Sequence, residues 1–392
     1  MPKYPDEVFV MKIRRIVFNV HLYIGLAAGL FLVLSGLTGS MIVFREEIEA
    51  LLHPELMETA VSGERVALQT VLNAAREAYP DDTIFSVRMP RTPEQTYLLK
   101  MNEPHGLFVY ADPYSGKLLG AHRQEDTFMG WVALVHTELL IGEAGETILG
   151  VSALLLICMS ITGFFLWWPP NGKGIGKLAR GFKVGWSAPW KKVIFDLHRA
   201  SGIYTIVFLL IIAFTGVSLV FNKAVVELTN FLTASVPRAA PPHSDPLGAR
   251  GMIPPLDDLL HQADSILSGP TTWINLPQTP AAPLVVRKKM PEEFHPNGRS
   301  FIYFDQYTGG VLCTENALTA PSGTRIYNFF YPLHIGVAGG TFTRILQVII
   351  GFSPLVLFVT GYLMWRNRTK AKAYSKSPRN LATSSTVLPR NK

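Results

Sequence analysis

The sequence has few cysteines, and this scarcity excludes several kinds of site. Among 392 residues there are two, Cys158 and Cys313. Cys158 falls in an apolar run and Cys313 in a polar segment, so we do not expect a disulfide between them. The sequence contains no C-x-x-C-H motif, which excludes covalent attachment of a c-type haem. Two thiols are also too few to hold an iron–sulfur cluster or a thiolate zinc site.

Acidic residues are scarce in three short segments, and this asymmetry predicts the topology. Residues 1–15, 169–192 and 366–392 contain 18 Lys and Arg but only two acids, whereas residues 45–145 and 222–340 contain 16 Lys and Arg and 25 acids. The positive-inside rule then places the short segments and both termini in the cytoplasm and the two long segments outside. The net charge of +7 follows from this topology, and it gives no reason to expect a nucleic-acid partner.

Long apolar runs are what the sequence has in abundance. Four of them, at residues 16–44, 146–168, 193–221 and 341–365, each exceed the ~20 residues that an α-helix needs to cross a bilayer. Lys12, Arg14 and Arg15 precede the first run, as in a signal peptide. That run is too long for a signal h-region and no A-x-A-like cleavage site follows it, so we expect an uncleaved anchor.

The chain is an internal repeat that places histidines at matching positions. Residues 20–44 and 197–221 align without a gap, with His21 opposite His198. Seven further positions are identical in the two runs, namely Gly25 and Gly202, Phe31 and Phe208, Leu32 and Leu209, Thr38 and Thr215, Gly39 and Gly216, Val43 and Val220, and Phe44 and Phe221. A second alignment, at an offset of 198, places His136 opposite His334; its other identities are Gly142 and Gly340, Thr162 and Thr360, Gly163 and Gly361, and Trp167 and Trp365.

The long outside segments repeat as well. The pattern Y-x-D-x-Y-x-G occurs at residues 110–116 and 303–309, between two alternating segments that predict the strands of a hairpin. A helix-like run precedes each hairpin, at residues 68–79 and 256–267. Each half of the chain therefore predicts a membrane helix with a histidine, an outside α+β module, a second histidine and a second membrane helix. Halves of this kind should be related by a pseudo-two-fold axis along the membrane normal.

Paired histidines in a helix bundle suggest the axial ligands of a b-type haem. Under the repeat, His21 would face His198 on the cytoplasmic side, and His136 would face His334 on the outer side. We therefore predict two bis-histidine haems. The alternative for the first pair is a histidine near the interface that bonds to a carbonyl or a lipid headgroup. For the second pair it is a plain surface histidine, and His136 could also pair with a methionine or hold a five-coordinate iron.

The height of His136 leaves two arrangements open. It lies 31 residues before Trp167. In a continuous helix the two residues would be ~46 Å apart, at ~1.5 Å per residue. A bilayer core is only ~30 Å thick. Either His136 stands above the bilayer, or the chain breaks at Gly142 and Gly145.

Two glycines have two possible roles, and several other residues have a structural role only. Gly25 and Gly202 follow their histidines by four residues, on the same helical face, where they could make room for a macrocycle or allow close helix packing. We read the Thr-Gly pair in each of the four helices as close packing and Pro354 as a kink. The remaining histidines have no partner in the repeat and read as solvated surface residues, namely His53, His105, His122, His243, His261 and His295.

These motifs together resemble the PepSY-associated transmembrane family. The resemblance rests on His21 with Leu-Thr-Gly after it, on the two Y-x-D-x-Y-x-G patterns, on H-T-E-L-L-I-G-E-A-G from His136, and on T-G-F-F-L-W-W-P at residues 162–169. It implies that the outside segments are PepSY-like α+β domains. Within the family, the sequence is most similar to inner-membrane ferric-siderophore reductases of the FoxB type. That similarity implies two haems, a bacterial inner membrane and reduction of iron in the periplasm.

We therefore predict a membrane α-helical protein with four transmembrane helices in two pseudo-symmetric halves. Its predicted segments are a cytoplasmic N-terminus at 1–15, helices at 16–44, 146–168, 193–221 and 341–365, periplasmic PepSY-like modules at 45–145 and 222–340, a cytoplasmic loop at 169–192 and a basic cytoplasmic tail at 366–392. The predicted function is electron transfer from a quinol or a cytoplasmic reductase, through the two haems, to a ferrioxamine-like ferric siderophore. The alternatives are a siderophore or iron transporter and a non-catalytic protein that binds partners through its PepSY modules.

Overall fold

The computed structural model describes residues 5–102, 106–169, 175–246 and 254–375. It divides into two compact units. The first comprises Met1–Ser40, Thr147–Val217 and Ile349–Lys392, and the second comprises Met41–Glu146 and Ser218–Val348. Most of the predicted basic tail, from residue 376 on, lies outside the described residues, as do residues 1–4 and 170–174 of the predicted cytoplasmic segments.

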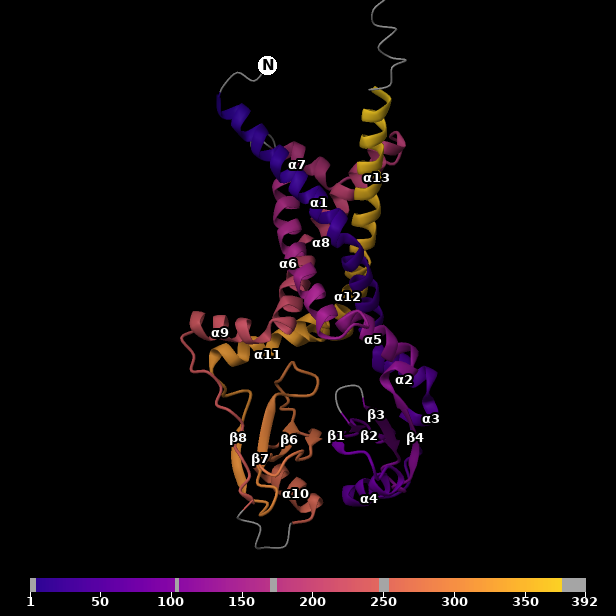
Figure 1. Cartoon of the computed structure of the whole chain (residues 1–392), viewed down its shortest axis with the longest axis vertical. Coiled ribbons are helices and arrows are strands. Elements are labelled where there is room, and N and C mark those ends of the chain that lie inside the picture. Colours follow the sequence, from indigo (N-terminus) through magenta and orange to yellow (C-terminus); the bar gives the residue numbers. More distant parts are fainter. Residues whose placement is uncertain (1–4, 103–105, 170–174, 247–253, 376–392) are drawn as a thin grey trace, which may run out of the picture. The chain divides into compact units, whose positions relative to one another are not determined.

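The first unit is a bundle of long helices. It contains α1 (Pro5–Ile42), α6 (Glu143–Trp167), α7 (Ile175–Gly181), α8 (Trp190–Val220) and α13 (Ser353–Ser375), and α1, α6, α8 and α13 run alongside one another in Figure 1. Four segments are long and apolar enough to cross a membrane: Phe9–Ile42, Glu143–Trp167, Trp190–Val220 and Val337–Lys370. They cover the four apolar runs of the sequence. Many large apolar side chains on them are exposed, as expected for helices that face lipid.

The last of these spans is interrupted. One residue, Phe352, separates the end of α12 (Gly340–Gly351) from the start of α13 at Ser353. Pro354 has no N–H to donate to the preceding turn. The sequence predicted a kink at Pro354, and the structure interrupts the helix there. The interruption lies against α1, because a Cβ added at Gly36 would lie 2.4 Å from the carbonyl oxygen of Gly351. Two glycines are thus needed where these backbones meet.

The second unit is built on one antiparallel sheet of eight strands in the order β4-β3-β2-β1-β5-β6-β7-β8. The first long segment supplies β1 (Ile84–Arg88), β2 (Tyr97–Met101), β3 (Leu107–Ala111) and β4 (Leu118–Arg123), and the second supplies β5 (Thr271–Asn275), β6 (Leu284–Lys288), β7 (Ser300–Phe304) and β8 (Val311–Glu315). The two predicted hairpins are confirmed as β3–β4 and β7–β8. The sequence did not predict that β1 pairs with β5 and joins the two segments into one sheet.

One face of this sheet carries the hydrophobic core. The two helix-like runs are confirmed as α4 (Leu68–Ala78) and α10 (Leu256–Ile266), and their apolar faces pack on the sheet in a single cluster. Val87, Ile274 and Val286 lie in that cluster with no exposed surface. Because side chains alternate along a strand, their neighbours point to the opposite face.

The turns of the two hairpins are alike. The Asp112 carboxylate accepts the N–H of Tyr114 at 2.8 Å, and the Asp305 carboxylate accepts the N–H of Tyr307 at 2.9 Å. The glycine of each pattern has a positive φ, 71° at Gly116 and 68° at Gly309, as such turns require. These aspartates therefore act as turn residues.

Short helices complete the second unit: α2 (Arg45–Leu52), α3 (Pro54–Met57), η1 (Gln124–Asp126), α5 (Phe128–Glu138), α9 (Asn222–Leu232), α11 (Ser322–His334) and η3 (Val337–Gly339). Helix α5 ends at Glu138, and the chain turns through left-handed conformations at Leu139, Leu140 and Gly142 before α6 begins at Glu143. The chain therefore breaks after His136, as one of the two sequence readings required. The break falls at Leu139–Gly142, whereas Gly145 is inside α6.

Candidate functional site

The bundle brings His21 of α1 and His198 of α8 together. Their ring centroids lie 6.4 Å apart, with an angle of 89° between the ring planes. The sequence repeat predicted that these two residues would face each other. Each ring is also held by a neighbouring helix, and that contact determines which nitrogen is free.

Threonine hydroxyls fix the tautomer of both imidazoles. The Nδ1 of His21 lies 3.0 Å from the Oγ1 of Thr162 in α6. The Thr162 hydroxyl donates its own hydrogen to the Cys158 carbonyl at 2.8 Å, so its oxygen accepts from the histidine N–H. A ring that donates from Nδ1 keeps its lone pair on Nε2, which is the usual state of a histidine that binds a metal.

His198 is held in the same way, and each histidine also bonds to a backbone carbonyl, that of Met159 for His21 and that of Leu357 for His198. The Nδ1 of His198 lies 2.9 Å from the Oγ1 of Thr360 in α13 and 3.1 Å from the Leu357 carbonyl oxygen. A carbonyl can only accept, so Nδ1 carries the hydrogen and Nε2 the lone pair. The two histidines have equivalent neighbours, since Thr162 and Thr360 correspond in the repeat.

The glycine after each threonine leaves space for the ring. A Cβ added at Gly163 would lie 3.2 Å from the Cε1 of His21, and one at Gly361 would lie 3.4 Å from the Cε1 of His198. Our reading of these Thr-Gly pairs as simple helix packing is therefore wrong for α6 and α13. The threonine orients a histidine from another helix and the glycine accommodates it. The signal was present in the sequence, because both pairs recur at the same offset as the second histidine pair.

Both rings line an apolar cavity within the bundle. Its volume is about 500 Å³, within the range of pockets that hold small molecules and cofactors. Its walls come from α1, α6, α8 and α13 and are mostly aliphatic, aromatic and glycine residues. Gly25 and Gly202 are among them, and a Cβ there would lie 3.0 Å from the Met159 Cε and 3.6 Å from the Leu357 Cδ2, respectively. The two readings of these glycines are thus compatible, because each lines the cavity and also lies close to a side chain of a neighbouring helix.

Three arginines add positive charge to the cavity wall: Arg14, Arg199 and Arg368. Arg14 donates to carbonyls at the C-terminal end of α6, including that of Leu166 at 2.7 Å. The Arg368 guanidinium lies 4.9 Å from the ring centroid of Phe18. Such a cavity, apolar with a few cations, suits a flat apolar molecule that carries acidic groups.

The second histidine pair lies in the other unit. His136, in the last turn of α5, and His334, the last residue of α11, have ring centroids 6.4 Å apart and planes at 45°. The Gln347 side chain donates to the His334 carbonyl at 2.8 Å. Gly336, with a φ of 74°, turns the chain immediately after this residue. The structure therefore brings together both pairs that the repeat predicted.

The separation within each pair fits a shared metal ion. A metal-bound imidazole nitrogen lies ~2.0–2.1 Å from the metal and ~1.2 Å from its own ring centroid, so two imidazoles on opposite sides of one ion have centroids ~6.4 Å apart. Across the described ranges, no group of three or more His, Cys, Asp or Glu side chains could hold a metal ion. A metal bound by either pair would need its other ligands from elsewhere, as water or a macrocycle can supply them.

The centroid distance alone does not identify a ligand pair. His53 and His122 also have centroids 6.4 Å apart. There, His122 contacts the Tyr110 hydroxyl through Nε2 at 3.1 Å and the Arg123 carbonyl through Nδ1 at 2.9 Å, so both ring nitrogens are occupied. In the bundle, by contrast, the hydrogen bonds that His21 and His198 make to described side chains both involve Nδ1. The His53–His122 pair is therefore a control that the chain itself supplies.

The family described as the PepSY-associated TM region matches residues 18–368, which include both histidine pairs and all eight strands. The chain belongs to this family. Among curated proteins, none matches it. Membership of this family agrees with the architecture described above, in which apolar helices long enough to cross a membrane accompany an antiparallel sheet. Family membership by itself assigns no cofactor and no reaction.

Proposed function

We propose that this protein is a haem-b-containing inner-membrane reductase that reduces a ferric siderophore in the periplasm. The observation that carries the proposal is the His21–His198 pair, held with Nε2 unprotonated beside an apolar cavity of about 500 Å³. An apolar cavity between helices with two neutral imidazoles is what a bis-histidine haem requires.

In this proposal the residues of the chain bind, orient and shield two haems. His21 and His198 would hold the inner one, and His136 and His334 the outer one. A haem supplies one-electron transfer, while the protein sets its ligands, surroundings and distance to the next carrier. Thr162 and Thr360 keep the inner imidazoles in one tautomer, and the apolar wall keeps water from the metal.

The proposed topology follows from charge. Short basic segments in the cytoplasm would place the inner pair near a quinol or a cytoplasmic reductase. The two halves would be related by a pseudo-two-fold axis, and the sheet would lie in the periplasm beside the outer pair. One electron delivered there converts Fe(III) to Fe(II), which oxygen chelators bind less tightly, so the siderophore releases its iron.

The test is haem content. We would record oxidised and dithionite-reduced absorption spectra of the detergent-purified protein and quantify haem as its pyridine haemochrome. The wild type should contain two b-type haems per chain. His21→Ala and His334→Ala should each lose about one, whereas His53→Ala, from the control pair, should lose none.

Each outcome has a distinct meaning. One haem, lost only in His21→Ala, would confine the cofactor to the inner pair. Absence of haem from all preparations, after expression with ample haem supply, would refute the reductase. In that case a siderophore or iron transporter, assayed by flux into liposomes without an electron donor, or a partner-binding protein would become the better assignment.

A further inference from the structure

The sheet face opposite the hydrophobic core carries arginines and aromatic residues in one row. In the strand register Arg88 lies opposite Trp273, Trp273 opposite Arg287, and Arg287 opposite Phe301. Residues opposite each other in neighbouring strands point to the same face. These four side chains therefore form a continuous row across β1, β5, β6 and β7, in which cations alternate with aromatic rings.

Two arginines, Arg287 in this row and Arg299 next to it, have no ion pair with a described residue. Arg287 donates through Nε and Nη2 to the Gly298 carbonyl, at 2.9 and 2.6 Å, and its guanidinium lies 5.6 Å from the ring centroid of Phe301. The Nε of Arg299 is buried and has no hydrogen-bond partner among the described residues.

One carboxylate, that of Glu293, attracts both guanidiniums, but its oxygens bond elsewhere. Glu293 accepts the N–H of Met290 at 3.1 Å, the hydroxyl of Ser300 at 2.7 Å and the N–H of Arg299. Burial, together with the charge of Arg299, lowers the pKa of Arg287 to about 10. One carboxylate leaves two half-buried guanidiniums with a net positive charge, which is costly, so this arrangement is expected where an anion completes the site.

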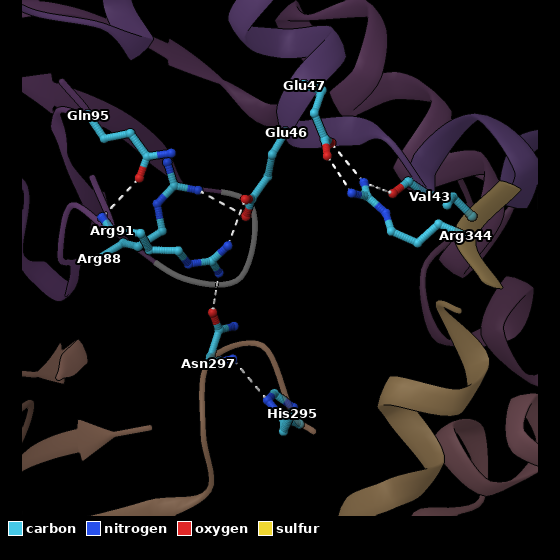
Figure 2. A network of polar contacts seen from close by, with 9 residues as sticks. All are labelled: Val43, Glu46, Glu47, Arg88, Arg91, Gln95, His295, Asn297 and Arg344. Carbon is cyan, nitrogen blue, oxygen red and sulfur yellow. Dashed lines mark hydrogen bonds and ion pairs between the residues drawn. The ribbon is translucent and has the colours of Figure 1, made fainter. Parts of the chain in front are cut away.

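The loop beside the row does not supply that anion. His295 is 5% exposed, so our reading of it as a solvated surface residue is wrong. Its Nδ1 accepts the N–H of Asn297 at 3.2 Å. Burial lowers its pKa to about 2, helped by Arg299, Arg287, Arg91 and Lys289, so the ring stays neutral. Figure 2 shows Arg91 shared between the Glu46 carboxylate at 2.9 Å and the Asn297 side chain at 2.6 Å.

This cationic site borders the helix of the outer histidine pair. His295 stacks on Tyr331 of α11, with ring centroids 5.0 Å apart and planes at 22°. Tyr331 and Tyr327 precede His334 by three and seven residues, which puts all three on one face of the helix. Tyr327 and Tyr331 both interact electrostatically with Arg299. The arginines and His334 therefore flank the same aromatic pair.

We propose that Arg287 and Arg299 bind the acidic oxygens of an anionic ligand that lies against Trp273 and Phe301. The site rests on the proposed function and specifies its substrate class: a ferric chelate with carboxylate or catecholate oxygens and a net negative charge. This differs from the cationic, ferrioxamine-like complex that the sequence suggested. The carboxylates of the outer porphyrin are the other source of the same chemistry, and the experiment separates the two.

The test measures binding without electron transfer. Full-length protein in detergent is titrated calorimetrically with Ga(III)–citrate, which is redox-inert and anionic, and with cationic Ga(III)–desferrioxamine B. The wild type should bind the citrate complex more tightly. Arg287→Gln and Arg299→Gln should each weaken that binding roughly 10- to 100-fold, as expected for the loss of a charge-assisted hydrogen bond.

Arg238→Gln is the matched control. Arg238 also lies over Phe301, 5.0 Å from its ring centroid, but it is paired with Glu315 and with the Tyr303 hydroxyl. Its replacement should change chelate affinity less than about 3-fold, since its charge is already neutralised. Arg299→Gln should not lower the thermal midpoint of unfolding, because its guanidinium is largely buried and forms no ion pair with a described residue. Weaker chelate binding without a lower unfolding temperature distinguishes a ligand-binding arginine from a structural one.

The remaining outcomes identify the source of the anion or overturn the site. If Arg299→Gln leaves chelate binding intact but shifts the midpoint potential or occupancy of the outer haem, the porphyrin carboxylates are the ligand. If chelate binding and outer haem in both variants match Arg238→Gln, the site is refuted. Chelate binding that depends on Arg299 in a protein without haem would support the site and refute the reductase.

Discussion

The sharpest prediction concerns the two threonines that hold the inner histidine pair. His21 bonds to the hydroxyl of Thr162 at 3.0 Å and also to the Met159 backbone carbonyl. His198 bonds to the hydroxyl of Thr360 at 2.9 Å and to the Leu357 carbonyl at 3.1 Å. Because the two sites match, Thr162→Val and Thr360→Val should disturb the inner haem to a similar extent.

The magnitude follows from one hydrogen bond. An acceptor on Nδ1–H makes the imidazole a stronger donor to the metal and favours Fe(III), so its removal should raise the midpoint potential. A net hydrogen bond contributes about 0.5–1.5 kcal/mol, which corresponds to ~20–65 mV for a one-electron couple. Because a carbonyl still accepts from each histidine, Thr162→Val and Thr360→Val should each shift the potential of the inner haem by less than about half of this amount.

The assay is a spectroelectrochemical titration in the His334→Ala background, where the inner haem would be observed alone. Thr205→Val is the control. The Thr205 hydroxyl bonds to the carbonyl four residues before it, that of Ser201, at 2.9 Å, as Thr162 does to Cys158, but it bonds to no histidine that the structure describes. A much larger shift in one variant than in the other would refute the equivalence of the two sites. Shifts no larger than that of Thr205→Val would refute the role of both hydroxyls.

Two further predictions concern stability. Gly36→Ala should destabilise the bundle by about 1–3 kcal/mol, because its Cβ would lie 2.4 Å from the Gly351 carbonyl oxygen, whereas Gly202→Ala, with its nearest contact at 3.6 Å, should be neutral in thermal unfolding. The folded-state pKa of His295, about 2, lies below its unfolded value. The unfolded chain therefore takes up the proton first as the pH falls, and stability drops below about pH 6.5. Between pH 7.5 and 5.0 the wild type should lose ~2 kcal/mol more than His295→Gln, and equal losses in denaturant titrations would contradict the burial of this ring.

Much of the architecture could be predicted from the sequence because it depends on local patterns. The apolar runs, the hairpins around Tyr110 and Tyr303, and the two amphipathic runs each have a periodicity that determines their secondary structure. The pairing of the histidines followed from the repeat, since equivalent residues of two like halves meet when they face inward. These inferences needed no knowledge of contacts between distant residues.

Other features depend on contacts between distant segments and could not be predicted. The sequence of β1 does not specify that its partner is β5, because any strand edge offers the same backbone groups. The roles of Thr162 and Thr360 depend on which helix packs beside which histidine. His295 has the composition of a loop residue, and only the stacking on Tyr331 and the surrounding arginines bury it. Long-range packing overrides local polarity at each of these positions.

The β1–β5 pairing also has a consequence for how the chain can be divided. Either half expressed alone would present an unpaired inner edge, β1 in one and β5 in the other. An open edge of this kind recruits any available strand, including that of an identical copy. A half-length chain would therefore self-associate through the same backbone groups that close the full-length sheet. Fusing two such halves in one polypeptide replaces a concentration-dependent encounter with an intramolecular one, which protects both edges at any expression level.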